Sequence, residues 1–196
     1  MNKVRTAGWA IGCAVAVTLG SCHSAPTRIY TLDPAVPATR IDTYQAPALR
    51  VDTLNVPAGW DRIEILSLST VGKLQISDFD HWSAPLAQIA RQTLSDDLDR
   101  RLPSGSVIYP RLPKSSAALG IDVDILEFTL DASQASMRAS WLIVPPVGSQ
   151  SAKRSVASLQ GAMTSTEPAA IAHAWSELIG QLADRIAADA ASFKTP

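Results

Sequence analysis

The stretch "SAPLAQIARQTLSDDLDRRLP" at residues 83–103 carries the clearest structural signal in the chain. Its apolar residues recur every three or four positions, the spacing that places side chains on one face of a helix. The pattern predicts a helix that begins near the start of this stretch and ends before Pro103. We expect the ion pairs Asp96–Arg100 and Asp97–Arg101 to lie on the solvent side. The expected buried stripe consists of Leu86, Ile89, Ala90, Leu94, Leu98 and Leu102.

A second helix and a series of strands complete the pattern. The helical spacing returns after residues 166–168, with its stripe at Ile171, Trp175, Leu178, Ile179, Leu182 and Ile186. Segments with strand-like alternation interleave with the two helices, which favours one α/β domain: a mixed central β-sheet with two main amphipathic helices packed on it. A change of phase near Leu126 predicts a bulge, and the order of the strands is not readable. The predicted strands are 29–32, 49–56, 62–68, 73–76, 107–109, 120–130, 137–144 and 152–161.

The N-terminus is typical of an export signal, because Lys3 and Arg5 precede an uncharged apolar run at residues 7–19. A helix of this length reaches about 20 Å, which is too short for the ~30 Å hydrocarbon core of a bilayer. The run ends in "LGSC" at residues 19–22, which resembles the bacterial lipobox. The resemblance implies cleavage between Ser21 and Cys22 and acylation of Cys22, which together anchor the chain stably to a membrane. The alternative is an ordinary signal peptide with a chance cysteine.

These signals predict three parts: a lipoprotein signal peptide at 1–21, a lipid anchor and proline-rich tether with one short strand at 22–47, and a domain at 48–196. The net charge of the full chain is −1, and it becomes more negative by two when the signal is removed. Without clusters of Lys and Arg, this charge argues against a nucleic-acid partner. Acylation of Cys22 would leave the mature chain without a disulfide, so we expect the domain to be stable by packing alone.

Residues with catalytic or metal-binding chemistry are sparse. Asp78, Asp80 and His81 lie together in "DFDH", but we interpret this stretch as a solvated loop and not as a metal site. The chain has 3 histidines, and the motifs of serine hydrolases, zinc proteases and nucleotide-binding proteins are absent from the sequence. We therefore expect no catalytic residue, no metal and no cofactor, and a protein that is not an enzyme.

The aromatic residues fall into two groups. Trp141 and Trp175 occupy regular core positions of a predicted strand and helix, so we expect both to be buried. Trp60, Phe79 and Trp82 fall at junctions between predicted elements. Aromatic residues at such junctions either close the end of a core or contact a partner. We favour the first interpretation and keep these three residues as candidates for partner contact.

The order of these features resembles that of the PqiC-type ABC-transport auxiliary lipoproteins, over nearly the whole mature sequence and with diffuse motifs. The most characteristic stretch is "HWSAPLAQIARQTLSDDLDRRLP" at 81–103, in which Pro-Leu and an amphipathic helix follow a tryptophan. The chain departs from the family at His81, where arginine is frequent, and at Ala84, where an acidic residue is frequent. The other matching segments are the lipobox, "IYTL" at 29–32, "VPAGWDRIEI" at 56–65, "DVDILEF" at 122–128, "MRASWLI" at 137–143 and the C-terminal helix.

The resemblance implies a lipid-anchored periplasmic subunit, working with an MCE-domain protein and an inner-membrane permease in lipid transport across the envelope. It implies the periplasmic face of the outer membrane, because His23, and not the aspartate of inner-membrane retention, follows Cys22. A non-catalytic adaptor suits this role, and a homo-oligomer around a tubular partner is compatible with it. Two alternatives remain open: an envelope lipoprotein that activates a cell-wall synthase or hydrolase by direct binding, and a small-molecule-binding lipoprotein with a closed apolar pocket.

Overall fold

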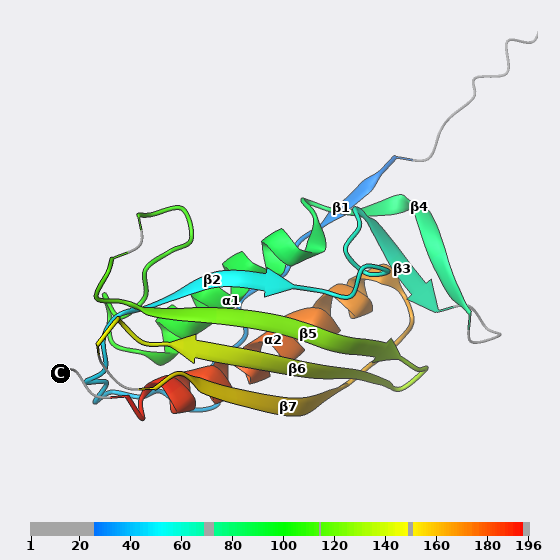
Figure 1. The fold of residues 1–196 in the computed structure, drawn as a ribbon. Coiled ribbons are helices and arrows are strands. Elements are labelled where there is room, and N and C mark those ends of the chain that lie inside the picture. The colour runs from blue at the N-terminus through cyan, green and yellow to red at the C-terminus, as the bar shows by residue number, and fades with distance from the viewer. Residues whose placement is uncertain (1–25, 69–72, 114, 149–150, 194–196) are drawn as a thin grey trace, which may run out of the picture.

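In the computed structural model, the described residues are 26–68, 73–113, 115–148 and 151–193. They form a single α/β domain, as predicted, but the strands divide between a four-stranded and a three-stranded sheet where one central sheet was expected (Figure 1). The elements are β1 (Arg28–Tyr30), β2 (Leu49–Asn55), β3 (Glu64–Leu68), β4 (Leu74–Trp82), α1 (Leu86–Arg101), β5 (Leu119–Leu130), β6 (Gln134–Val144), β7 (Lys153–Ala162) and α2 (Pro168–Ala190).

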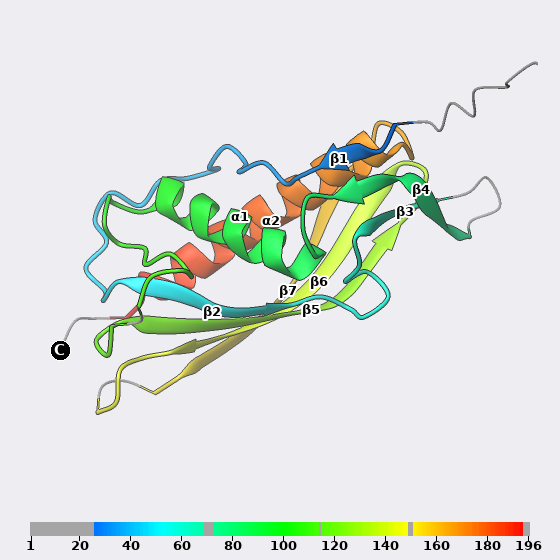
Figure 2. The same cartoon turned by 90° about the horizontal axis from the view of Figure 1, so that it is seen from above.

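The four-stranded sheet has the order β2-β5-β6-β7, in which β2 runs parallel to β5 and the other neighbours are antiparallel. Both helices cover one face of this sheet, and the core lies between them and the strands (Figure 2). The pairing of β5 with β6 shifts between Ile125 and Glu127, which confirms the predicted bulge near Leu126. Val107 forms an isolated bridge with Leu49, so the strand predicted at 107–109 is reduced to this one contact.

Both predicted helix stripes are buried. Every stripe residue of α1 and α2 lies in the hydrophobic core, and the start of α1 at Leu86, directly after Pro85, is close to the predicted one. Trp175 is fully buried and stacks on Phe128 with ring centroids 3.9 Å apart, and Trp141 is also buried. Within the described residues, no helix combines the length and apolarity needed to cross a bilayer.

The expected solvent exposure of Asp97 and Arg101 is wrong. The two residues do form the predicted ion pair, with Arg101 Nη1 3.0 Å from Asp97 Oδ1, but their side chains are 1% exposed or less. The second helix covers this side of α1, and it supplies Asp184 and the carbonyl of Gly180 as further partners of the guanidinium. A local pattern of charges four residues apart is the same whether the helix face meets water or another helix.

The interpretation of "DFDH" as a solvated loop is also wrong, because β4 continues through this stretch to Trp82. The strands predicted at 62–68 and 73–76 pair antiparallel as the hairpin β3–β4, as their short separation in the sequence favours. The connecting residues 69–72 lie outside the described residues. On the other side of β4, the short strand β1 pairs in parallel. Arg28 of β1 makes a bidentate ion pair with Asp80. This pairing allows the charged Asp80 side chain to be buried in the sheet.

The segment predicted as a tether is packed on the domain from Arg28 onward. It runs along the outer side of both helices before it enters β2 (Figure 2). Leu32 is buried in the core, the Ala35 amide donates to Asp97, and the Ile41 amide donates to the carbonyl of Arg101. This differs from the expected domain boundary at residue 48, because residues 28–47 are held in place and add nothing to the reach of a tether.

Candidate functional site

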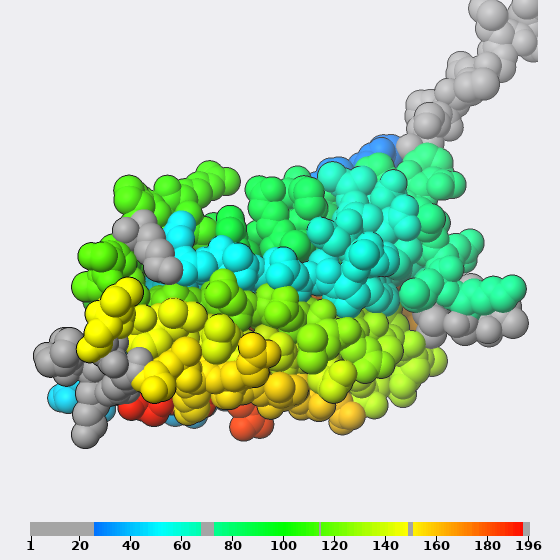
Figure 3. Space-filling model, in the orientation of Figure 1, coloured from blue at the N-terminus to red at the C-terminus, as the bar shows by residue number. Residues whose placement is uncertain are grey.

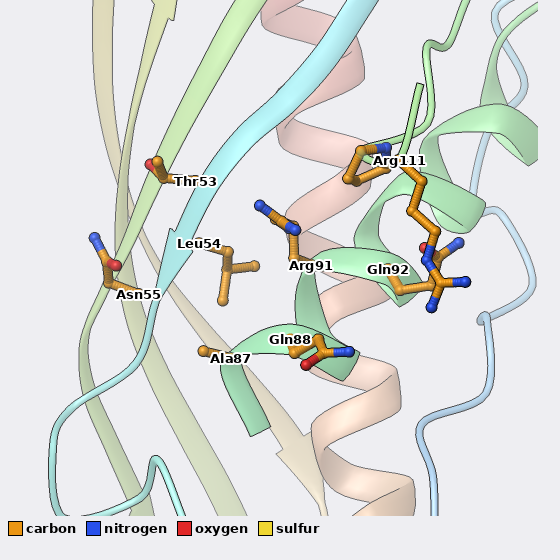
Figure 4. Close-up of a pocket in the computed structure, with 9 residues that line it drawn as sticks. Thr53, Leu54, Asn55, Ala87, Gln88, Arg91, Gln92 and Arg111 are labelled. Carbon is orange, nitrogen blue, oxygen red and sulfur yellow. The ribbon is translucent and has the colours of Figure 1, made fainter. Parts of the chain in front are cut away.

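A cavity of about 460 Å³ opens between β2 and the first half of α1 (Figure 4). Strand β2 forms an edge of the four-stranded sheet, and beyond the bridge between Leu49 and Val107 no strand of the described residues pairs with its outer side. The segment after α1 contributes the remaining wall. The lining residues are Thr53, Leu54, Asn55, Ala87, Gln88, Arg91, Gln92, Pro110 and Arg111.

Two guanidinium groups give this cavity its chemical character. Arg91 extends from α1 toward β2 and donates from Nη1 to the carbonyl of Asp52 at 3.1 Å (Figure 4). Arg111 lies beside Gln92 and is exposed. The segment after α1 is held against β2 by Arg50, which donates to the carbonyl of Pro110 at 2.7 Å and pairs with Asp52 at 2.6 Å.

The lining residues of the cavity can bind but offer little for catalysis. They include two arginines, three side-chain amides and one hydroxyl, and no carboxylate, histidine or cysteine is among them. The two guanidinium groups suit the recognition of carboxylate or phosphate oxygens. The hydroxyl and two of the amides already donate to carboxylates of this chain, those of Asp122, Asp124 and Asp96. General acid–base catalysis requires a group that exchanges a proton near neutral pH, and no group of that kind lines the cavity.

A second polar cluster lies buried between α1, α2 and the N-terminal segment. Asp97 Oδ1 accepts hydrogen bonds from the Ala35 amide at 2.9 Å and from Arg101, while Arg101 Nε donates to Asp184 at 2.6 Å. Asp97 Oδ2 is buried without a hydrogen-bond partner among the described residues. Desolvation by burial therefore raises the pKa of Asp97 to about 6, against the opposing effect of Arg101. The cluster fixes where the N-terminal segment crosses the helices.

The predicted "DFDH" residues do not converge on a common point. Asp78 is exposed, Asp80 is buried against Arg28, and His81 is half-buried. The hydrogen bonds from Arg28 lower the pKa of Asp80 to about 2. No group of three or more His, Cys, Asp or Glu side chains within the described residues is placed to hold a metal ion.

The three aromatic candidates for partner contact differ in how exposed their side chains are. Trp82 is 3% exposed and belongs to the core, and Trp60 is half-buried with its ring centroid 4.8 Å from that of Phe128. Phe79 is 42% exposed and is the one of the three with a large free surface. Ser21 and Cys22, the predicted cleavage and acylation residues, lie outside the described residues.

Sequence reasoning missed the cavity and the buried cluster. Arg91 and Arg111 lie twenty residues apart in the chain, and nothing local indicates that both face the edge of β2. The burial of Asp97 depends on Asp184, which is 87 residues away, and on the Ala35 amide. One signal was available for the cluster: Asp97 and Arg101 adjoin the apolar stripe of α1, where charges facing a second helix would need partners.

The fold occurs in solved structures of low sequence identity. An uncharacterized protein superposes with a TM-score of 0.66 at 17% identity, with 84% of this chain and 99% of that chain covered. A protein from Xanthomonas campestris, described as a DUF330 protein, superposes with a TM-score of 0.56 at 15% identity, with 81% and 92% covered. At these identities the likeness establishes the fold alone. No curated protein matches the sequence.

A match to a protein family supplies the identity. Residues 30–187 match the family described as the ABC-type transport auxiliary lipoprotein component. The match begins within β1 and ends near the end of α2, so it spans both sheets, both helices and the N-terminal segment that crosses them. The chain therefore belongs to the family of ABC-type transport auxiliary lipoprotein components.

Proposed function

We propose that this chain is a PqiC-type, lipid-anchored and non-catalytic adaptor of an envelope lipid-transport system. It is acylated at Cys22 and faces the periplasm from the outer membrane. Its partners are an MCE-domain protein and an inner-membrane permease of the same system. The proposal is narrower than the family assignment, which establishes only that the chain belongs to a family of lipoproteins with an auxiliary role in ABC-type transport.

The observation that carries the proposal is the family match over residues 30–187, preceded by the lipobox-like "LGSC" at 19–22. The chemistry of the cavity between β2 and α1 supports the non-catalytic part, because its lining lacks a group for proton transfer or nucleophilic attack. The two arginines of this lining suit contact with an acidic or phosphate-bearing group on a partner.

Crosslinking in cells tests the proposed partners. The acylated chain is purified after crosslinking, and we expect an MCE-domain protein and an ABC permease among the captured proteins. A Cys22→Ala chain should capture neither, because the anchor supplies the local concentration that a weak contact needs. Capture of a cell-wall synthase or hydrolase in their place would support the alternative function, which no comparison with known proteins favours.

A charge reversal tests whether the cavity is the contact site. Arg111→Glu should reduce crosslinking to the partner, because it replaces an exposed cation of the cavity with an anion. Arg138→Glu is the matched control: Arg138 is also exposed, on the face of β6 that points away from the helices. Equal yields from the two variants would remove the cavity from the proposal and leave the partners unaffected.

A further inference from the structure

Exposed apolar side chains gather on the three-stranded sheet. Ile29 on β1 is 62% exposed, and Leu74, Ile76 and Phe79 on β4 are 51%, 48% and 42% exposed. We call these four residues the hairpin patch. Other large apolar side chains exposed in the described residues, such as Val36, Val147 and Val156, lie on separate elements. Grouped exposure of this kind marks a contact surface more often than single exposed residues do.

The pairing of β4 with β3 is irregular in the part of β4 that carries the exposed apolar side chains. Leu66 pairs with Ile76, and Glu64 pairs with His81, so two steps along β3 correspond to five along β4. Three extra residues on β4 between these two pairs break the simple alternation of faces. Ile76 and Phe79, an odd number of residues apart, are both exposed. The outer part of the hairpin projects beyond the body of the domain (Figures 1 and 3).

The direction of β1 places the proposed membrane anchor at the end of the three-stranded sheet that carries the hairpin patch. Because β1 pairs in parallel with β4, with Arg28 opposite Asp80, the chain before Arg28 leaves the sheet toward the part of β4 that carries Phe79, Ile76 and Leu74. The ion pair between Arg28 and Asp80 fixes this exit point. The six residue steps from Cys22 to Arg28 span about 20 Å at most. An acylated Cys22 would therefore hold this sheet close to the bilayer surface.

The charges around the patch favour a neutral partner surface. Six charged side chains of the three strands and their flanking residues balance one another, and Asp61 and Glu167 nearby add two negative charges, so this surface does not attract anionic lipid. Contact through this patch would depend on apolar burial, as for other interfacial segments, with only a weak dependence on salt. The charged residues are Arg28, Arg62 and Lys73 against Glu64, Asp78 and Asp80.

We propose that the hairpin patch rests in the interface of the bilayer to which Cys22 is anchored, so that the lipid anchor and the β3–β4 hairpin together orient the domain on the membrane. The inference rests on the acylation of Cys22 in the proposed function. It adds a second membrane contact and a fixed orientation, with the helices and the β2–α1 cavity carried at a set position above the surface.

Site-specific fluorescence in phosphatidylcholine liposomes tests this contact. The full-length precursor is expressed so that it is processed and acylated, and an introduced Ile76→Cys is labelled with an environment-sensitive fluorophore. We expect a blue shift, and a loss of fluorescence when nitroxide-bearing phosphatidylcholine is included. The matched control is Val156→Cys, an exposed apolar position on β7 that should show neither effect.

A second experiment replaces two other apolar residues of the hairpin patch. Leu74→Ser together with Phe79→Ser should weaken membrane contact of the Ile76→Cys label at least about tenfold, because each inserted apolar side chain adds to the partition free energy. Both residues are largely exposed, so the melting temperature should stay close to that of the parent chain. An unchanged melting temperature would show that the loss comes from the surface and not from unfolding.

The outcomes separate the patch from the anchor. If the acylated chain floats with the liposomes and position 76 is as solvated as position 156, the docking inference is overturned and the anchor stands. If mass spectrometry finds no acyl group on Cys22, the proposed anchor fails and the docking inference fails with it. A blue shift that grows with protein concentration and resists the nitroxide lipid would assign the patch to a second copy of the chain and overturn membrane contact.

Discussion

Two carboxylates hold the N-terminal segment on the domain, and their surroundings differ in almost every respect. Asp80, on the central strand of the three-stranded sheet, meets Arg28 of the edge strand β1, and each carboxylate oxygen accepts a guanidinium hydrogen bond. Asp97 meets the Ala35 amide between the two helices, where one of its oxygens has no partner among the described residues. The first pKa falls to about 2, while the second rises to about 6.

The comparison shows that ion pairing and burial compete, with opposite results at the two ends of one segment. At Asp80 the hydrogen bonds outweigh the desolvation, so the charged form is stabilised. At Asp97 the desolvation outweighs the effect of Arg101, so the charge is tolerated at a cost. A buried ion pair of the second kind fixes a geometry, here the crossing of the N-terminal segment, without adding much to stability.

Truncation gives the largest expected effect, because it removes both contacts at once. A chain that starts at residue 48 lacks β1 and the buried Leu32, and it leaves Asp80 and Asp97 without their N-terminal partners. We expect it to lose cooperative thermal unfolding or to melt far below a chain that starts at residue 26. Equal melting temperatures for the two chains would show that residues 28–47 are a tether after all.

Removal of the arginines separates the two contacts. Arg101→Met should reduce the free energy of unfolding by about 3–5 kcal/mol, because Asp97 then lies buried without a counter-charge. Arg28→Met should cost less, because the Arg28 side chain is 62% exposed. Urea unfolding of both variants at pH 7 measures the difference, and a larger loss for Arg28→Met would reverse the comparison.

The pH dependence of stability should carry opposite signs at the two sites. Because the pKa of Asp97 is raised, its contribution to the free energy of unfolding is fully present below about pH 4. As the pH rises through about 6, the free energy of unfolding falls by roughly 3 kcal/mol at most. Because the pKa of Asp80 is lowered, its contribution is present above about pH 4 and is lost as the pH falls toward about 2.

Two isosteric variants assign these slopes. The free energy of unfolding is measured by urea from pH 2 to pH 7 for the parent chain, Asp97→Asn and Asp80→Asn. We expect Asp97→Asn to flatten the decline between pH 4 and 6, and Asp80→Asn to flatten the acid limb. A decline between pH 4 and 6 that persists in Asp97→Asn would mean that another group causes it.

The smallest expected effect concerns the point where the N-terminal segment crosses α2. A Cβ on Gly180 would overlap the Cβ of Ala35, so Gly180→Ala should cost about 1–3 kcal/mol as the N-terminal segment shifts. Gly161→Ala is the control, since its Cβ would meet Leu178 Cδ2 at an ordinary 3.7 Å. If Gly180→Ala is as stable as Gly161→Ala, the segment does not press on α2 as described.

The sequence predicts the parts of this molecule that depend on local pattern. The helix stripes and the bulge near Leu126 follow from spacing along one segment, and both are confirmed. The errors concern residues whose environment comes from far along the chain. Asp80 is buried by Arg28, 52 residues away, and Asp97 by Ala35, 62 residues away, so neither contact leaves a local signal. The cavity between β2 and α1 is hidden for the same reason.

Native-state hydrogen exchange tests the central claim most directly, namely that the domain begins at Arg28, only six residues after the proposed acylation site Cys22. The amides of Ala35 and Ile41 donate to Asp97 and to the carbonyl of Arg101. We expect both to exchange through the same opening reaction as the central amides of α1, with similar protection. Exchange of Ala35 and Ile41 at the rate of an unfolded chain, while α1 stays protected, would contradict the claim and return these residues to a long tether.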